Sequence, residues 1–140
     1  MRISAKGEYA IKAMLDLAVH FEHGLIPIQE IAERQGLPQR YLEQVLLLLK
    51  RAGFLTSKRG SAGGYHLRRP PDDITVGAVL RTIEGSLERR EAGRDHSGDL
   101  TEFWEEVSAA VSQVIDRVTF EDLRRRVEAR RSAQRLMYHI

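Results

Sequence analysis

Two short amphipathic segments separated by "GLP" constrain the fold of this chain most. "IQEIAERQ" (28–35) has helical spacing and ends before Gly36, a residue that favours the left-handed backbone of a helix end. Pro38 can open the next helix, "PQRYLEQVLLLLKRA" (38–52), because its missing N–H is no loss in a first turn. The apolar residues of that second helix form one stripe, Leu42, Val45, Leu46 and Leu49. The pair predicts a helix-turn-helix, and an ordinary helical hairpin is the alternative.

The second of these helices has a polar beginning. If its apolar stripe faces the core, the side chains left exposed in the first turn and a half are Gln39, Arg40, Tyr41, Glu43 and Gln44. In a helix-turn-helix protein this part of the recognition helix lies in the major groove, where side chains reach base edges. We therefore predict that these five residues contact DNA.

The next stretch, "KRGSAGGYHL" (58–67), is rich in glycine and begins with two basic residues. A phosphate-binding loop needs Lys and a hydroxyl directly after its last Gly, but Tyr65 follows Gly64 here. The flanks "GFLTS" and "YHLRR" have strand composition, so the stretch is predicted to be a β-hairpin tip. A hairpin directly after the second helix is the wing of a winged helix. Its predicted DNA contacts are Lys58, Arg59 and Ser61, with the two cations bound to phosphates or a narrow minor groove.

Charge and length agree with this interpretation. Residues 1–71 contain 11 Lys and Arg against 6 Asp and Glu, whereas residues 72–140 contain 11 against 14. A basic first half is typical of a nucleic-acid module, and the acidic second half then suits assembly or sensing. The 140 residues suffice for one small domain with a helical extension. Charged residues interrupt the first twenty positions, so we expect neither a signal peptide nor a membrane span, and a cytoplasmic protein.

The rest of the chain divides into further helices and one loop. Helices are predicted over 4–22, with Ser4 as N-cap, and over 76–84, with Thr75 as N-cap. The predicted organisation is a winged helix-turn-helix domain over 1–85, a mobile loop over 86–100, and a dimerisation helix with a C-terminal tail over 101–140. The fold class is mainly α with a small β-hairpin (α+β).

The segment 101–118 has the longest amphipathic pattern. Its apolar residues recur at three- and four-residue steps, and they are Phe103, Val107, Ala110, Val111, Val114, Ile115 and Val118. A small domain cannot cover so long a stripe, so we predict that Phe103, Val107, Val111, Val114 and Val118 form a homodimer interface. "TFEDL" then restarts a helix, with Thr119 and Asp122 placed for a capping box.

Catalytic and metal chemistry find little support in the sequence. The chain has no Cys, which excludes disulfides, thiolate metal sites and iron–sulfur clusters held by several Cys. His20 and His23 are spaced to touch one metal ion, but such a pair is far more often ordinary surface. Ser61 lacks the sequence context of a nucleophile, and no base accompanies it. We expect neither an enzyme nor a bound cofactor.

Several co-linear motifs resemble the Rrf2 family of bacterial winged-helix transcription regulators. They are "MRISAKGEYA", "IAERQGLPQRYLEQVL", "KRAGFLTSKRGSAGGYHL", "ITVGAVLRTIEG" and "VTFEDL". The resemblance implies a homodimer that binds a partly palindromic double-stranded DNA operator and dimerises through the long penultimate helix. It implies that Tyr41, Glu43 and Gln44 read the major groove and that Arg59 enters the minor groove. Cluster-binding members carry three Cys in the loop corresponding to 86–100; this chain has none, and Glu8 and His96 cannot replace them.

Within the family, the Cys-free loop and the tail "LMYHI" resemble the repressor of cysteine metabolism most. That protein works with cysteine synthase, whose active site holds an amino-acid carboxylate. By this resemblance Ile140 would enter that site, with Met137 and Tyr138 at its mouth; the alternative is that the tail folds back on the dimer. A protein-interaction adaptor that has lost DNA specificity remains the second interpretation of the whole chain.

Overall fold

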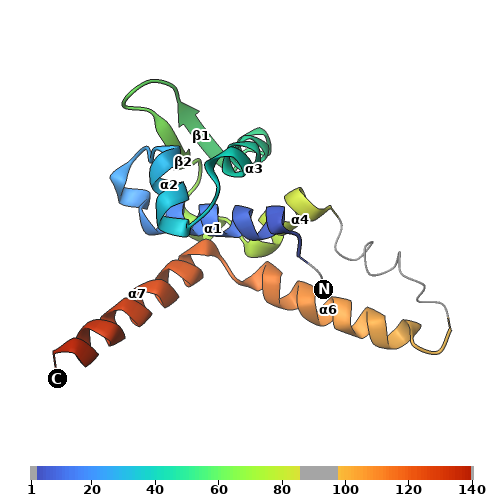
Figure 1. Ribbon diagram of the computed structural model, residues 1–140. Helices are drawn as coiled ribbons and strands as arrows, with labels where there is room; N and C mark the ends of the chain where they lie inside the picture. The colour runs from blue at the N-terminus through green and yellow to red at the C-terminus, as the bar shows by residue number, and fades with distance from the viewer. Residues whose placement is uncertain (1–2, 86–97, 140) are drawn as a thin grey trace.

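The computed structural model describes residues 3–85 and 98–139 of the chain. In these residues helices dominate and the strands form one two-stranded antiparallel sheet, which confirms the predicted fold class (Figure 1). The first half contains α1 (Ala5–Val19), η1 (Phe21–His23), α2 (Ile28–Gln35), α3 (Gln39–Arg51), β1 (Leu55–Lys58) and β2 (Gly64–Leu67). The second half contains η2 (Pro71–Asp73), α4 (Val76–Glu84), α6 (Thr101–Arg117) and α7 (Phe120–Tyr138).

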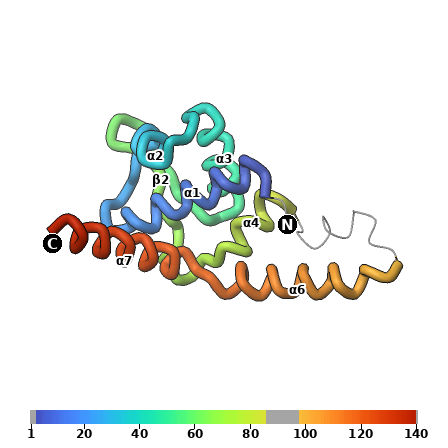
Figure 2. The backbone as a smooth tube through the Cα atoms, turned by 60° about the horizontal axis from the view of Figure 1, so that its bottom comes forward, coloured from blue at the N-terminus to red at the C-terminus, as the bar shows by residue number. Residues whose placement is uncertain are grey.

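Helix α1 forms the centre of the molecule. It begins where the Ser4 hydroxyl accepts a 3.1 Å hydrogen bond from the Gly7 N–H, and it packs against α2, α3, α4 and α7. Its fully buried residues include Ala13, Met14 and Leu17. Figures 1 and 2 show α2, α3 and the hairpin on one side of α1, and α6 and α7 on the other. The helix is shorter than predicted, because a 3-10 turn replaces its last residues.

The turn between α2 and α3 follows the prediction in its main feature. Gly36 has φ 64° and ψ 40°, the left-handed conformation that ends α2, and the Leu37 N–H donates a 2.9 Å hydrogen bond to the Ala32 carbonyl. Leu37 is buried beneath the corner. Pro38 differs from the prediction: its ψ of 122° is extended, so it precedes α3 as N-cap and does not occupy the first turn. The extended residue redirects the chain from α2 into α3.

The hairpin pairs Leu55 with Leu67 at its base and Lys58 with Gly64 near its tip. A third segment joins it, because Ile26 and Tyr65 exchange two backbone hydrogen bonds of 2.8 Å each. A Cβ on Gly64 would lie 2.4 Å from the backbone of Ile26, so only glycine permits this approach. The segment before α2 thereby holds the hairpin against the helix-turn-helix.

A second backbone connection links α4 to the junction between α6 and α7. Thr75 and Thr119 form a β-bridge, flanked by a 2.9 Å bond from the Val76 N–H to the Val118 carbonyl. Phe120, the first residue of α7, is fully buried in the core, and Thr119 and Asp122 form the predicted capping box. The Thr119 backbone N–H, donating to the Asp122 carboxylate, lowers the pKa of that carboxyl.

Among the described residues, no helix is both long and apolar enough to cross a membrane.

Candidate nucleic-acid interface

The recognition surface is built on α3. Its inward side is buried as the spacing predicted, through Leu42, Val45, Leu46 and Leu49. The five side chains predicted to reach DNA are all exposed, and they are Gln39, Arg40, Tyr41, Glu43 and Gln44. Of these, Tyr41 exposes 57% of its surface, a large fraction for an aromatic residue. The first turn and a half of α3 thus presents both hydrogen-bond donors and acceptors to solvent.

An ion pair with a buried carboxylate fixes the helix that precedes the recognition helix. Asp16 on α1 is 1% exposed, and its carboxylate accepts two 2.9 Å hydrogen bonds from Arg34 and one of 3.1 Å from Gln35, both on α2. The hydrogen bonds to Asp16 raise the pKa of the Arg34 guanidinium. Sequence analysis missed this pair, since Asp16 lies among apolar residues of α1 with nothing local to identify its partner. It ties α2 to α1 and so orients α3.

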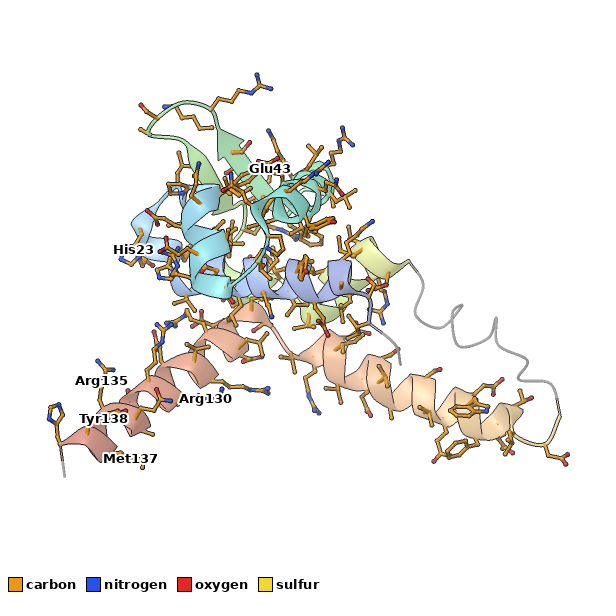
Figure 3. All side chains as sticks on the ribbon, viewed as in Figure 1. His23, Glu43, Arg130, Arg135, Met137 and Tyr138 are labelled. Atoms are coloured by element: carbon orange, nitrogen blue, oxygen red, sulfur yellow. The ribbon has the colours of Figure 1, made fainter. Side chains whose placement is uncertain are left out.

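The hairpin places its three predicted DNA contacts at its tip. Lys58 is the last residue of β1, Arg59 and Ser61 follow in the turn, and all three are exposed. Figure 1 shows the hairpin projecting on the α3 side of the molecule, away from α6 and α7. Figure 3 shows the Glu43 side chain on this same side. The hairpin tip and the polar part of α3 therefore lie on one side, as in a winged helix-turn-helix.

Four further exposed cations lie near the base of the hairpin, and they were not among the DNA contacts predicted from the sequence. Lys50 and Arg51 end α3, and Arg68 and Arg69 follow β2, all with exposed side chains. The Arg69 guanidinium lies 6.0 Å from the ring centroid of Phe54, within the range of a cation–π contact. In the sequence, the signal for these cations was the pair of adjacent basic residues on either side of the hairpin. Cations at these positions suit contacts to the phosphate backbone.

The apolar stripe of α6 is divided between two environments. Ile115 is buried against Leu80 of α4, and Val111 packs half-buried on the same cluster. Phe103 and Val114, at 52% and 50% exposure, remain open to solvent. Of the other predicted interface residues, Val107 and Val118 are half-buried. The outward part of the stripe thus consists of Phe103, Val107, Ala110 and Val114, at steps of four, three and four residues.

The C-terminal end of α7 projects from the body of the protein. Leu136, Met137 and Tyr138 are 67%, 78% and 89% exposed, and Figure 3 shows the last two far from Glu43. Within a single chain these three residues do not pack on the core, and packing of the tail on the dimer stays a prediction. Ile140, the residue predicted to enter a partner, lies outside the described residues.

The two histidines considered for a metal do not form a metal site with their neighbours. The ring centroids of His20 and His23 are 5.5 Å apart, and His20 Nδ1 lies 2.8 Å from the Asp16 backbone carbonyl. Within residues 3–85 and 98–139, no three His, Asp or Glu side chains come together as metal ligands. Glu8 is exposed on α1, and His96 lies outside the described residues.

An exposed polar recognition helix, a basic hairpin tip on the same side and a rigid helical core define a DNA-binding protein of the winged helix-turn-helix class. Residues 3–126 match the Rrf2 family, described as iron-dependent transcriptional regulators, and the chain belongs to that family. This confirms the resemblance derived from the motifs. Because its relatives are transcriptional regulators, the expectation that the chain is not an enzyme is confirmed as well.

The similar proteins include the regulators IscR and CymR. The HTH-type transcriptional regulator IscR of Sodalis glossinidius is 40% identical over 129 residues, covering 88% of this chain and 78% of its own length. The regulator CymR of Bacillus subtilis is 38% identical over 123 residues, covering 88% and 89%.

Two of the similar solved structures are those of an IscR and a CymR. The structure of T. potens IscR has a TM-score of 0.77 at 41% identity and covers 91% of this chain and 88% of its own. That of CymR, the global cysteine regulator of B. subtilis, has a TM-score of 0.80 at 35% identity and covers 89% and 96%.

The residues of this chain do not fit the iron that the family description implies. Iron–sulfur clusters in regulators need thiolate ligands, and the sequence contains no Cys. The described carboxylates and imidazoles do not gather in threes either. We therefore derive no step of DNA binding through a metal.

Proposed function

We propose that this protein is a homodimeric repressor that binds a partly palindromic operator. The observation that carries the proposal is the joint exposure of the polar start of α3 and the basic hairpin tip on one side of the molecule. Arg40 and Gln44 have the side chains that pair bidentately with guanine and adenine edges. Glu43 can accept a hydrogen bond from a cytosine amino group. Lys58 and Arg59 add contacts to phosphates or to the minor groove.

Base reading is tested by the variant Gln44→Ala. Genomic footprinting first supplies the bound sites, and gel shifts then compare operator with scrambled DNA. Loss of one good base contact should cost about 1–3 kcal/mol and relax the preference at one position in each half-site. Gln134→Ala on α7, an equally exposed glutamine on the far side, is the matched control. Equal binding of operator and scrambled DNA by the unaltered protein would favour the adaptor interpretation.

The proposed dimer uses the outward stripe of α6. Steps of four, three and four residues are those of a coiled-coil seam, and they bring Phe103, Val107, Ala110 and Val114 onto one line. Val114 is half-exposed, so Val114→Glu introduces a charge on the seam without disturbing the chain's own core. Val111 is a less selective position because it packs on Leu80 and Ile115.

Light scattering should report a monomer for Val114→Glu and a dimer for the control Gln113→Glu, which adds the same charge beside the seam. Operator affinity should fall steeply in the monomer, since two half-sites are held together only by a dimer. A dimer that survives Val114→Glu unchanged contradicts the assignment of α6.

We further propose that the protein regulates cysteine metabolism with cysteine synthase as co-regulator. Support comes from the similarity to CymR, whose solved structure is described as that of the global cysteine regulator, and from the Cys-free sequence. The exposed apolar end of α7, Leu136 to Tyr138, is available for a partner. By the resemblance to the repressor of cysteine metabolism, Ile140 is the residue that would enter the synthase active site, with Met137 and Tyr138 at its mouth.

Calorimetry with cysteine synthase of the same organism tests this proposal. Deletion of Ile140 should abolish binding, whereas Ile140→Val, which keeps a branched side chain, should retain most of it. Acetylserine should displace the full-length protein by competition and so couple sulfur supply to DNA occupancy. Undiminished binding after the deletion, or no displacement by acetylserine, refutes the docking of Ile140 in the synthase active site, and an absence of any binding by the full-length protein refutes the partnership; operator binding is untouched by either result.

A further inference from the structure

Leu47 is an exposed leucine on the recognition helix. Its exposed fraction is 44%, although it lies in the middle of α3 and next to a well-packed core. Four other residues already supply the buried side of this helix, so Leu47 is not needed there. Its surroundings on the outer side therefore decide what it does.

Leu47 lies on the same side of α3 as the predicted base-reading residues. With 3.6 residues per turn, Arg40, Glu43, Gln44 and Leu47 form one surface at positions i, i+3, i+4 and i+7. All four are exposed. The same spacing is used where a recognition helix lies along a major groove and reads base edges. A helix seated in the groove by Arg40 and Gln44 brings Leu47 into it as well.

The major groove offers one apolar feature to an aliphatic side chain. Guanine, adenine and cytosine present hydrogen-bond donors and acceptors, whereas thymine adds a C5-methyl group. Leucine can form no hydrogen bond, so beside polar base edges it would only remove water from groups that need it. We propose that Leu47 determines specificity by packing against the methyl group of a thymine in each half-site. This inference rests on the proposed placement of α3 in the major groove.

A second copy of the chain does not cover Leu47 in the proposed dimer. Helix α6 lies on the opposite side of the molecule from α3, with α1 between them (Figures 1 and 2). A dimer formed through α6 therefore leaves Leu47 uncovered. Leu48, 37% exposed, lies about 100° further round the helix beside Tyr41, at the edge of the surface. The other side chains on the same side of α3 as Leu47 are polar. Such a surface suits contact with one methyl group among polar base edges.

Thymine-to-deoxyuridine substitution tests the proposal one methyl group at a time. Each thymine of the footprinted operator is replaced in turn, which removes the C5-methyl and leaves base pairing unchanged. The unaltered protein should bind one such operator about fourfold more weakly, the loss for one buried methyl group of about 0.8 kcal/mol. Leu47→Ala should bind the thymine and deoxyuridine operators equally. Leu136→Ala on α7 is the matched control and should retain the fourfold difference.

The outcomes separate this inference from the proposed function. If the protein prefers its operator but no thymine shows a Leu47-dependent loss, Leu47 does not read a methyl group. If Leu47→Ala weakens binding while the fourfold difference at that thymine persists, its contact lies elsewhere and the inference is wrong. Absence of any operator preference in the unaltered protein overturns the proposed function and this inference with it. Circular dichroism melting of Leu47→Ala, expected to match the unaltered protein, shows that the fold is retained.

Discussion

Breaking the Asp16–Arg34 pair should affect the protein differently according to which partner is removed. Asp16→Ala leaves Arg34, which is 33% exposed and keeps a 3.2 Å hydrogen bond to Glu30. Arg34→Ala removes both guanidinium donors from the Asp16 carboxylate, which is 1% exposed in the unaltered protein and keeps the 3.1 Å hydrogen bond from Gln35. A solvated cation tolerates the loss of its partner better than a buried anion does.

The structure sets the expected magnitudes. Removal of one partner from a buried ion pair typically costs about 3–5 kcal/mol of unfolding free energy. We expect about 2–3 kcal/mol for Asp16→Ala, because Arg34 stays partly in water, and about 4 kcal/mol for Arg34→Ala. The double variant should be less destabilised than Arg34→Ala alone, since it no longer buries an uncompensated charge. The coupling between the two sites should therefore exceed roughly 2–3 kcal/mol.

Urea denaturation followed by circular dichroism measures these values, at one protein concentration because a dimer's stability depends on it. Arg125→Ala, which removes a 71% exposed arginine from α7, is the control and should change stability by about 0.5 kcal/mol or less. Additive single-variant effects, or a cost below about 1 kcal/mol for Arg34→Ala, would refute the reasoning.

Three further predictions concern the hairpin, α1 and metal chemistry. Lys58→Ala should weaken binding to all DNA sequences and lower the salt slope by about one ion in gel-shift titrations, and a base-specific effect with an unchanged slope would contradict the phosphate role. Gly7→Ala should destabilise the protein by about 1–3 kcal/mol in denaturation, because the added Cβ would lie 2.3 Å from a Glu84 carboxylate oxygen; stabilisation by the better helix former would contradict this. Anaerobic incubation with iron and sulfide should leave the protein colourless and its operator affinity unchanged, and visible absorbance from a bound cluster would be the opposite result.

Features determined by neighbouring residues could be predicted from the sequence. The bounds of α2 followed from its spacing and Gly36, and the capping box at Thr119 and Asp122 followed from residues three apart. The exposure of the polar residues of α3 followed from the position of its four apolar residues. In each case a local pattern and its structural consequence occupy the same few residues.

Features that join distant segments could not be predicted in this way. The Asp16–Arg34 pair, the pairing of Ile26 with Tyr65, and the contact of Glu84 with Ser4 each depend on the tertiary fold. The stripe of α6 illustrates the same limit. Its residues share one face in sequence, but the contact with α4 covers Ile115 and leaves Val114 open. Spacing identifies an apolar face without identifying which neighbour covers each part of it.

The β-bridge between Thr75 and Thr119 attaches the last turn of α6 to the body of the protein, so a change in the direction of α6 would pivot about this end. The bridge, the ion pair of Arg81 with Asp116 and the burial of Ile115 all hold that end of the helix. With a rise of about 1.5 Å per residue, α6 spans roughly 25 Å, so a tilt of about 5° at the pivot moves its far end by roughly 2 Å. In a dimer joined along α6, the same tilt changes the separation of the two recognition helices. In the proposed dimer, the half-site spacing that the protein can bind therefore depends on the orientation of α6 at a position remote from the DNA.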